Sequence, residues 1–315
     1  MGKKKKLPQI VKEIRAYKPD EINYSYQKNV SYSQFSMYRS CPHKWALQYK
    51  DGHKIFSSTV HTVFGTALHE ALQHYLDVMY EESGAAADRL DIYTIFEDAL
   101  REEYKVQYKK NKGQHFSSSE ELREFYEDGV EILKTFKKKK GQYFTKRGWY
   151  LVGCEIPVMV TPNKFYNNVI YQGYLDIVMY HEPTQTFKII DIKTSTRGWN
   201  DKTKKDEDKQ FQLVLYKKFF SEQFNIPIEN IDVEFFIVKR KVYDHPDFII
   251  PRIQTFKPAS GKVKLNKATK SLNSFIEEVF NKQGYKDKNY TPTPSKWNCT
   301  FCPFRDNPEL CGVAQ

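Results

Sequence analysis

The sequence predicts an α/β protein with a mixed central β-sheet flanked by helices. Three observations predict it: a long amphipathic helical pattern in the first third, three successive Val-, Ile- and Tyr-rich segments in the middle, and alternating helix and strand patterns after them. No segment approaches the ~20 apolar residues that span a bilayer, and the start of the chain lacks the apolar core of a secretory signal. We therefore expect a cytoplasmic protein without a membrane partner.

The N-terminal half is predicted to be mostly helical. Residues 1–30 are polar and basic, so we expect a flexible lead-in. From Thr62 to Tyr80 apolar residues recur every three or four positions, which indicates an amphipathic helix. Residues 81–148 are charged and helical in pattern, with a break around Lys112–Ser119, and we interpret them as a helical insertion. The insertion belongs to a single domain over residues 31–315.

The C-terminal half carries the strands. Period-two and β-branched patterns predict them at Leu151–Val160, Val169–Tyr180, Phe187–Thr194, Asp232–Val238 and Phe248–Phe256. Helices are expected at about Asp206–Phe224 and Val263–Asn281. Residues 290–315 form a Pro- and Cys-containing tail that we expect to be irregular.

The charge of the chain suits a polyanionic partner. Its 50 Lys and Arg residues outnumber 39 Asp and Glu residues, which gives a formal net charge of +11. Such a balance is compatible with nucleic-acid binding but does not establish it. The lysines cluster at Lys3–Lys6, at Lys137–Lys140, and at Lys262, Lys264, Lys267 and Lys270. Solvated tails and helix faces are the alternative interpretation of each cluster.

Two aspartates and a lysine stand on neighbouring predicted strands. Asp191 and Lys193 alternate with isoleucines, so they share one face of their strand, and Asp176 lies between two apolar residues of the strand before it. If the strands pair, Asp176 and Asp191 converge, and a hard cation such as Mg²⁺ or Mn²⁺ would offset their charge. Lys193 would then orient an attacking water or a phosphate oxygen. For each residue alone, the alternative is a solvent-facing position.

This pattern resembles the signature of RecB-type PD-(D/E)XK nucleases. Its three parts, a G-x-x-D strand, a hydrophobic-D-x-K strand and a Q-x-x-x-Y helix, correspond here to Gly173–Asp176, Ile189–Lys193 and Gln212–Tyr216. The resemblance implies a restriction-endonuclease-like core in which Asp176, Asp191 and the carbonyl of Ile192 bind the metal. It implies that Lys193 is the catalytic base or positions the water, supported by Gln212 and Tyr216.

The resemblance extends to two residues upstream. The family carries a G-x-x-x-H helix whose His completes the metal site, and Gly65–His69 matches it. This implies that His69 is a third side-chain ligand. Glu155 matches a Glu often found in the first strand of this group, which implies a supporting role beside the ligands. An outward-facing strand residue is an equal alternative for Glu155.

The five cysteines do not suggest a disulfide framework, because their number is odd and we expect an intracellular protein. In the Cas4 and AddB branches of the same family, an early Cys-Pro joins three C-terminal cysteines around a [4Fe–4S] cluster. The resemblance implies the same set here: Cys41, Cys299, Cys302 and Cys311. The tail over residues 290–315 would then pack against the Cys41 region as a Cys-rich clip.

The spacing of the last two cysteines departs from that pattern. Eight residues separate Cys302 from Cys311, more than the family pattern has. Structural Zn²⁺ held by the same four thiolates is therefore an alternative, and unbound core cysteines are another. Cys154, which lies in a predicted strand, is interpreted as a small core residue.

Together these motifs predict a Mg²⁺- or Mn²⁺-dependent deoxyribonuclease. We expect an exonuclease that acts on single-stranded DNA or on duplex ends, with the lysine clusters contacting phosphates. The main alternative is a catalytically silent DNA-binding or scaffold module in a helicase–nuclease or recombination complex. A zinc protein whose function lies in the cysteines is a weaker alternative, because it leaves the aspartates and Lys193 unexplained.

Overall fold

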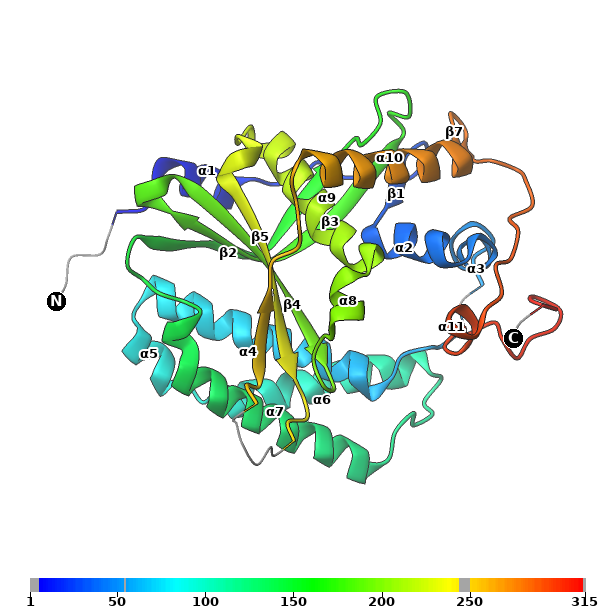
Figure 1. Cartoon of the computed structure of the whole chain (residues 1–315). Coiled ribbons are helices and arrows are strands. Elements are labelled where there is room, and N and C mark those ends of the chain that lie inside the picture. The colour runs from blue at the N-terminus through cyan, green and yellow to red at the C-terminus, as the bar shows by residue number, and fades with distance from the viewer. Residues whose placement is uncertain (1–5, 54, 244–249, 314–315) are drawn as a thin grey trace. The chain divides into compact units, whose positions relative to one another are not determined.

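The computed structural model of the chain is described for residues 6–53, 55–243 and 250–313 (Figure 1). Its helices are α1 (Gln9–Ala16), α2 (Tyr32–Ser40), α3 (Pro42–Trp45), α4 (Val60–Glu81), α5 (Gly84–Arg89), α6 (Ile92–Lys110), α7 (Ser119–Lys139), α8 (Asp201–Lys205), α9 (Glu207–Phe224), α10 (Lys262–Val279) and α11 (Lys296–Cys299). Its strands are β1 (Lys28–Val30), β2 (Trp149–Val160), β3 (Val169–His181), β4 (Thr186–Ser195), β5 (Ile231–Lys239), β6 (Ile253–Phe256), β7 (Phe280–Asn281) and β8 (Gly284–Tyr285).

The chain forms two compact units. The first comprises Met1–Lys18, Ser58–Ile156 and Tyr174–Ser260, and the second comprises Pro19–Ser57, Pro157–Gly173 and Gly261–Gln315. In the described part of the chain, no helix is both long enough and apolar enough to cross a membrane.

The sheet of the first unit contains a fork. β3 and β4 are antiparallel, and their ladder ends at the pair Ile177–Ile190. β4 and β5 are parallel and stay paired as far as Ser195–Lys239, and β6 adds an antiparallel edge to β5. From Asp191 onward β4 therefore runs beside β5 without a ladder partner in β3. This mixed sheet confirms the predicted α/β fold class.

Helices cover both faces of the strands in the first unit. On one face, Ile190 and Ile192 of β4 and Phe236 of β5 belong to a hydrophobic core shared with α4, α6 and α7, and Figure 1 shows these three helices packed together beside β4 and β5. On the other face, α9 contacts β4 and β5; Phe220, for example, makes an edge-to-face ring contact with Phe187 at 5.5 Å. The core residues follow the period-two alternation that the sequence shows.

The second unit is built around a buried tryptophan. Trp45 is fully buried, and its ring lies 5.7 Å from Phe275 of α10, 5.4 Å from Tyr290 and 5.7 Å from Tyr38 of α2. β1 pairs in parallel with the first residues of β3. The aromatic cluster therefore joins the beginning of this unit to its C-terminal helix.

Several elements differ from the sequence-based expectations. The expected flexible lead-in contains α1, in which Val11 and Ile14 are buried, because these two residues lie on one face of a short amphipathic helix. The tail expected to be irregular contains the short α11.

The ends of three other elements also differ. The last long helix ends at Val279, and β7 and β8 follow it as a small hairpin. β6 begins only at Ile253. Part of the strand expected at Phe248–Phe256 lies outside the described residues, as do three lysines of the Lys3–Lys6 cluster.

Candidate metal centre and active site

The fork between β3 and β4 brings the two predicted aspartates together. Asp176 and Asp191 are the residues next in register after the last ladder pair, Ile177–Ile190. The side chain of Asp176 bridges the opening, because its Oδ2 accepts a 2.7 Å hydrogen bond from the backbone N–H of Ile192. The splayed strands thus hold two carboxylates at the point where the backbone ladder stops.

When ionised, the two carboxylates carry negative charge that the protein only partly compensates. Burial and then the negative charge of Asp191 raise the pKa of Asp176 well above its usual range. Burial also raises the pKa of Asp191, against the lowering effect of Lys193. Asp191 is 2% exposed, and its Oδ2 has no partner in hydrogen-bond geometry among the described residues. Two adjacent buried carboxylates favour a bound cation.

Lys193 is the cation nearest to this pair. Its Nζ lies 2.7 Å from Oδ2 of Asp191, which is close enough for an ion pair. Burial lowers the pKa of Lys193, but the charges of Asp191 and Asp176 outweigh burial and raise it overall. Lys193 therefore stays protonated, which suits a group that stabilises negative charge.

His69 approaches the carboxylates from α4. Its Nδ1 lies 3.6 Å from Oδ2 of Asp176, beyond hydrogen-bond range. Burial, followed by the positive charge of Lys193, lowers the pKa of His69 to about 4, so the imidazole is neutral at physiological pH and able to bind a metal. Gly65, one turn earlier, lets α4 run close to β4, because a Cβ there would lie 3.3 Å from Oγ1 of Thr194.

Gln73, one turn after His69, is a site residue that the sequence analysis missed. Its Nε2 donates to Oε1 of Glu155 at 2.6 Å and to the carbonyl of Asp176 at 3.0 Å. Glu155 adopts a positive φ of 52° within β2, a conformation that is strained for a non-glycine residue. The periodicity of α4 could have placed Gln73 beside His69, but only the tertiary structure shows its partners.

The Q-x-x-x-Y pair lies on α9. The side chain of Gln212 donates to the hydroxyl of Tyr216 at 3.4 Å, one helical turn away. Burial raises the pKa of Tyr216, and the charges of Asp191 and Asp176 add to this effect. Tyr216 is therefore buried within electrostatic range of the carboxylates, and the structure brings together the residues predicted for the hydrolytic site.

The donor set fits a hard divalent cation chemically. It offers two carboxylates, a neutral imidazole and the backbone of Ile192, which are ligands that Mg²⁺ or Mn²⁺ accepts. Within the described ranges, no group of three or more His, Cys, Asp or Glu side chains is already arranged to hold a metal ion. Binding would therefore require the side chains of His69 or the aspartates to move.

The four predicted cluster cysteines line one small cavity in the second unit. The cavity has a volume of about 20 Å³, and its lining includes Cys41, Cys299, Cys302 and Cys311. None of the five cysteines of the chain forms a disulfide. The tail also contacts the Cys41 region through the backbone of Ser40, whose carbonyl accepts hydrogen bonds from Thr293 and Asn298, each 2.7 Å long.

Cys154 belongs to the first unit and does not line this cavity. Its thiol is within 3.9 Å of Oδ1 of Asp77, and burial, with nearby acidic groups, raises its pKa strongly. A thiol with a raised pKa is a poor nucleophile and a poor metal ligand.

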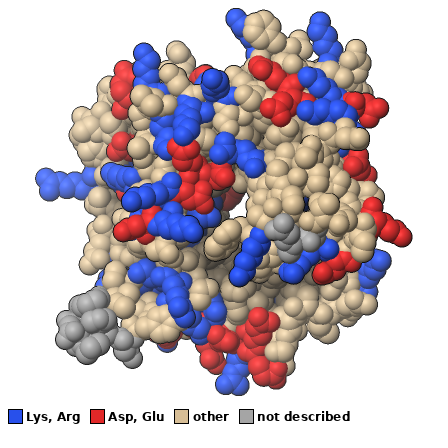
Figure 2. Space-filling model, turned by 45° about the vertical axis from the view of Figure 1, so that its right-hand side comes forward, with Lys and Arg blue, Asp and Glu red and all other residues tan. Residues whose placement is uncertain are grey.

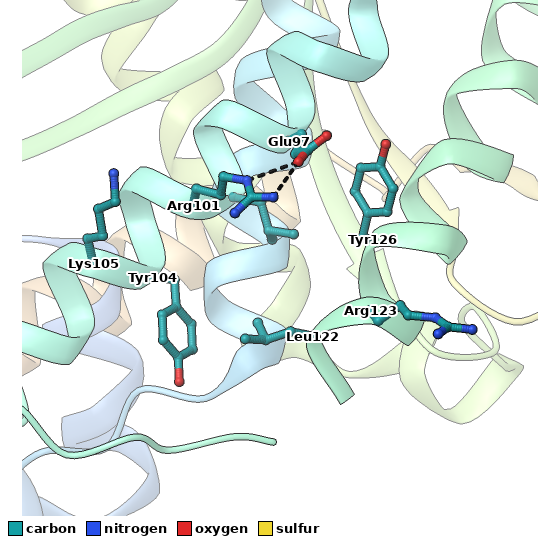
Figure 3. A pocket seen from close by; sticks show the side chains of 8 residues that line it. Glu97, Arg101, Tyr104, Lys105, Leu122, Arg123 and Tyr126 are labelled. Carbon is teal, nitrogen blue, oxygen red and sulfur yellow. Dashed lines mark hydrogen bonds and ion pairs between the residues drawn. The ribbon is translucent and has the colours of Figure 1, made fainter. Parts of the chain in front are cut away.

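A larger cavity in the first unit is lined by none of the residues predicted for the two sites. It has a volume of about 450 Å³ and lies between α6 and α7, with Tyr104, Leu122 and Tyr126 among its lining residues (Figure 3). Arg101 on its rim is paired with Glu97 at 2.6 Å. The carboxylates, Lys193 and the four cysteines do not line it, so its size alone does not mark the reaction site.

Surface charge does not by itself identify a nucleic-acid interface. On the face shown in Figure 2, basic and acidic side chains are interspersed. In the Lys137–Lys140 cluster, Nζ of Lys140 pairs with the carboxylate of Asp88 at 2.8 Å. Nζ of Lys137 donates a hydrogen bond to the backbone carbonyl of Asp88. Part of that cluster therefore stabilises the protein, while Lys262, Lys267 and Lys270 on α10 are exposed.

Comparison with known proteins agrees with this geometry. The family model described as "PD-(D/E)XK nuclease superfamily" matches residues 29–307, which is most of the chain. No curated protein matches the sequence. The matched region includes the fork, α4, α9 and three of the four cysteines, Cys41, Cys299 and Cys302, and nucleases of this superfamily are enzymes that act on nucleic acid. The chain therefore belongs to the PD-(D/E)XK nuclease superfamily.

Proposed function

We propose that the protein is a Mg²⁺- or Mn²⁺-dependent deoxyribonuclease whose reaction takes place at the fork between β3 and β4. One observation carries the proposal: Asp176 and Asp191 meet just beyond the last ladder pair, with Lys193 2.7 Å from Asp191. Phosphodiester hydrolysis needs these parts, because the attacking water must be activated and negative charge develops on the phosphate.

Each residue has a defined task in this proposal. Asp176, Asp191 and His69, with the carbonyl of Ile192, would hold the cation. When bound, the cation supplies Lewis-acid stabilisation of the phosphate and lowers the pKa of its water. Lys193 offers a fixed positive charge for a phosphate oxygen or the water.

Four further residues hold this arrangement in place. Gln212 and Tyr216 close the α9 side of the site, supported by their own hydrogen bond. Glu155, held by Gln73, adds a third carboxylate near Asp176.

The substrate we propose is DNA with single-stranded or duplex ends, degraded exonucleolytically. The test is digestion of end-labelled linear and circular DNA, single- and double-stranded, with Mn²⁺ and with EDTA. We expect cleavage of linear substrates, none of circular ones, and none in EDTA. Cleavage of circular DNA would replace exonuclease with endonuclease activity. Binding without cleavage under all conditions would favour the catalytically silent scaffold.

We also propose that the protein belongs to the RecB/Cas4/AddB-like branch and holds a [4Fe–4S] cluster. The supporting observation is that Cys41 lines one cavity together with the three C-terminal cysteines. Four thiolates suit either an iron–sulfur cluster or Zn²⁺. Metal analysis of the purified protein separates these two cofactors.

A further inference from the structure

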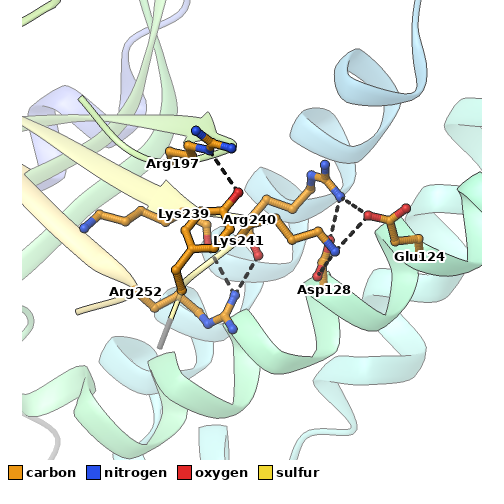
Figure 4. A network of polar contacts seen from close by, with 8 residues as sticks. Glu124, Asp128, Arg197, Lys239, Arg240, Lys241 and Arg252 are labelled. Carbon is orange, nitrogen blue, oxygen red and sulfur yellow. Dashed lines mark hydrogen bonds and ion pairs between the residues drawn. The ribbon is translucent and has the colours of Figure 1, made fainter. Parts of the chain in front are cut away.

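Basic side chains gather where β4 and β5 end and β6 begins (Figure 4). Two of them form ion pairs with acidic residues of α7: Nη1 of Arg240 pairs with Asp128 at 2.6 Å, and Nζ of Lys241 pairs with Glu124 at 2.8 Å. Arg252 instead donates to the two backbone carbonyls at the end of β5. These three side chains fix the strand ends, so their contacts are accounted for within the protein.

Three other cations, Arg197, Lys204 and Lys239, surround the turn that follows β4, and we call them the turn cluster. Among the described residues, no carboxylate pairs with Arg197 or Lys239. Arg197 is exposed; its Nε donates to the hydroxyl of Tyr243 at 2.9 Å, and its guanidinium lies 4.9 Å from the centre of that ring. Lys204 has a loose partner in Asp201, which is 89% exposed, at 3.7 Å.

The charge of Lys239 is the least compensated of the three. Its side chain is partly buried, and burial followed by the positive charge of Lys204 lowers its pKa. A partly buried ammonium group in a positive field is costly unless an anion neutralises it. Among the described residues no carboxylate pairs with Lys239, and an anionic ligand would supply the missing charge.

Contacts on both sides hold the turn in place, which suits a preformed binding site. Gly198 has φ +89°, and a Cβ there would lie 2.7 Å from Cε of Lys239, so the turn rests directly on the aliphatic part of that lysine. The amide of Gln254 holds the next residue on both sides, accepting from the N–H of Trp199 at 2.9 Å and donating to its carbonyl at 3.1 Å. Little ordering would therefore be needed on binding.

The register of the sheet relates this cluster to the fork. Lys193 pairs with Ile237, and Ser195 pairs with Lys239, in the parallel ladder of β4 and β5. Paired residues of parallel strands share a face, so Lys239 lies on the same face as Lys193. It lies two residues further along, which is roughly 7 Å in the strand direction.

We propose that the turn cluster binds the phosphodiester backbone of the substrate strand beside the reaction site. The proposal rests on the nuclease function proposed above and adds the direction in which the strand leaves the fork: along β4 towards Arg197. Charge complementarity supports a polyanion, and the contacts would be independent of base sequence. The exposed ring of Tyr243 beside Arg197 is available for stacking on a base.

The test is binding of a fluorescein-labelled single-stranded oligonucleotide to the full chain in EDTA, followed by anisotropy over a range of salt concentrations. The variant is Arg197→Ala with Lys239→Met, because Met keeps an unbranched chain against Gly198. The matched control is Arg123→Ala with Lys257→Ala. It removes the same two charge types from exposed positions of the same unit, which pair with Glu127 and Asp232. Circular dichroism and melting temperature check folding of both.

We expect the turn-cluster variant to bind at least ~10-fold more weakly than the wild type, and the slope of log K against log salt to fall by about 1.4 for two lost phosphate contacts. The control should bind within ~3-fold of the wild type. Equal losses in the two variants would overturn the proposal, because they would show a non-specific effect of net charge. A milder single variant, Lys204→Ala, should give an intermediate loss.

Failure of this proposal and failure of the nuclease proposal give different results. Cleavage by the wild type with Mn²⁺, together with unchanged binding by the turn-cluster variant, rejects the turn cluster and keeps the nuclease. Weakened binding by the variant, together with no cleavage by the wild type, keeps the binding site and rejects catalysis. Repeating the titration with RNA of the same sequence shows whether the site distinguishes the two backbones.

Discussion

The backbone N–H of Ile192 donates a 2.7 Å hydrogen bond to Oδ2 of Asp176, one residue beyond the last ladder pair of β3 and β4. The Asp176 side chain thus accepts a hydrogen bond beyond the point where the backbone pairing of β3 and β4 stops. The bond orients the Asp176 carboxylate towards β4, where Asp191 stands. The fork is therefore a defined structure and not a frayed strand end.

The first prediction concerns these carboxylates. Asp176→Asn and Asp191→Asn should abolish cleavage, because each removes a charged metal ligand. Without metal, Asp176→Asn should not melt at a lower temperature than the wild type, because it also removes one of two like charges that burial has brought together. Asp191→Asn also removes the ion-pair partner of the buried Lys193, so it should melt at a lower temperature. The Asn at position 176 can still accept from Ile192. Thermal melts with and without Mn²⁺ measure the stability of each variant, and a cleavage assay measures its activity.

Mn²⁺ at 100 times its dissociation constant should stabilise the wild type by about 2.7 kcal/mol and the two variants by far less. Asp232→Asn, at an exposed position of β5, is the control and should behave as the wild type. If either variant keeps both the Mn²⁺-dependent stabilisation and the cleavage rate, the assigned ligands are wrong.

Lys193 should affect rate more than metal binding. Lys193→Met is expected to lower the cleavage rate by roughly 10² or more, because a positioned charge at the phosphate contributes several kcal/mol to transition-state stabilisation. It should keep the Mn²⁺-dependent rise in melting temperature. The comparison variant is Lys188→Met, on the same strand, whose ammonium lies 3.8 Å from Glu234. Loss of Mn²⁺ binding in Lys193→Met would show a structural role instead.

The core of this site was predictable because it depends on strand alternation. Asp191 and Lys193 occupy one face of a strand flanked by isoleucines, and Asp176 occupies the matching place in the strand before it. The hairpin-like order of these strands left few alternatives for their pairing. The helix of His69 was recognisable from its 3.6-residue period, and the four cysteines from their resemblance to a family pattern.

Other parts depend on tertiary contacts that no local pattern encodes. In the sequence, Gln73 has no feature that distinguishes it from other helix residues. Its role is visible only from its hydrogen bonds to Glu155 and to the carbonyl of Asp176. The positive φ of Glu155 is a property of the folded strand. Lys239 joins the face of Lys193 only through the parallel register of β4 and β5, which the sequence alone did not specify.

Gln73 gives a third prediction. Gln73→Leu should destabilise the protein by about 1 kcal/mol, because the partly buried carbonyl of Asp176 and the carboxylate of Glu155 both lose a donor. It should also lower the cleavage rate, with Gln73→Glu failing to rescue because it brings a further negative charge. Chemical denaturation and initial rates measure these effects. A double variant with Glu155→Gln that shows strict additivity would contradict the coupling between the two side chains.

The last prediction concerns the cysteines. Cys41 and the three C-terminal cysteines line one cavity of the second unit although some 260 residues separate them in sequence. If they bind one cluster, protein purified without oxygen should be brown and contain about four irons per chain. Replacing any of the four with Ser should lower the iron content and the melting temperature, because a shared ligand cross-links both ends of that unit.

Cys154→Ser is the internal control for that series. It removes a thiol from β2 that contacts Asp77 and is not among the cavity-lining cysteines, so iron content should stay at the wild-type level. Colourless protein with stoichiometric zinc would keep the cross-link and change the cofactor. Colourless protein with neither metal, together with a Cys41→Ser variant as stable as the wild type, would reject the cluster. The hydrolytic site would still stand, because its residues belong to the first unit and share no ligand with the cysteines.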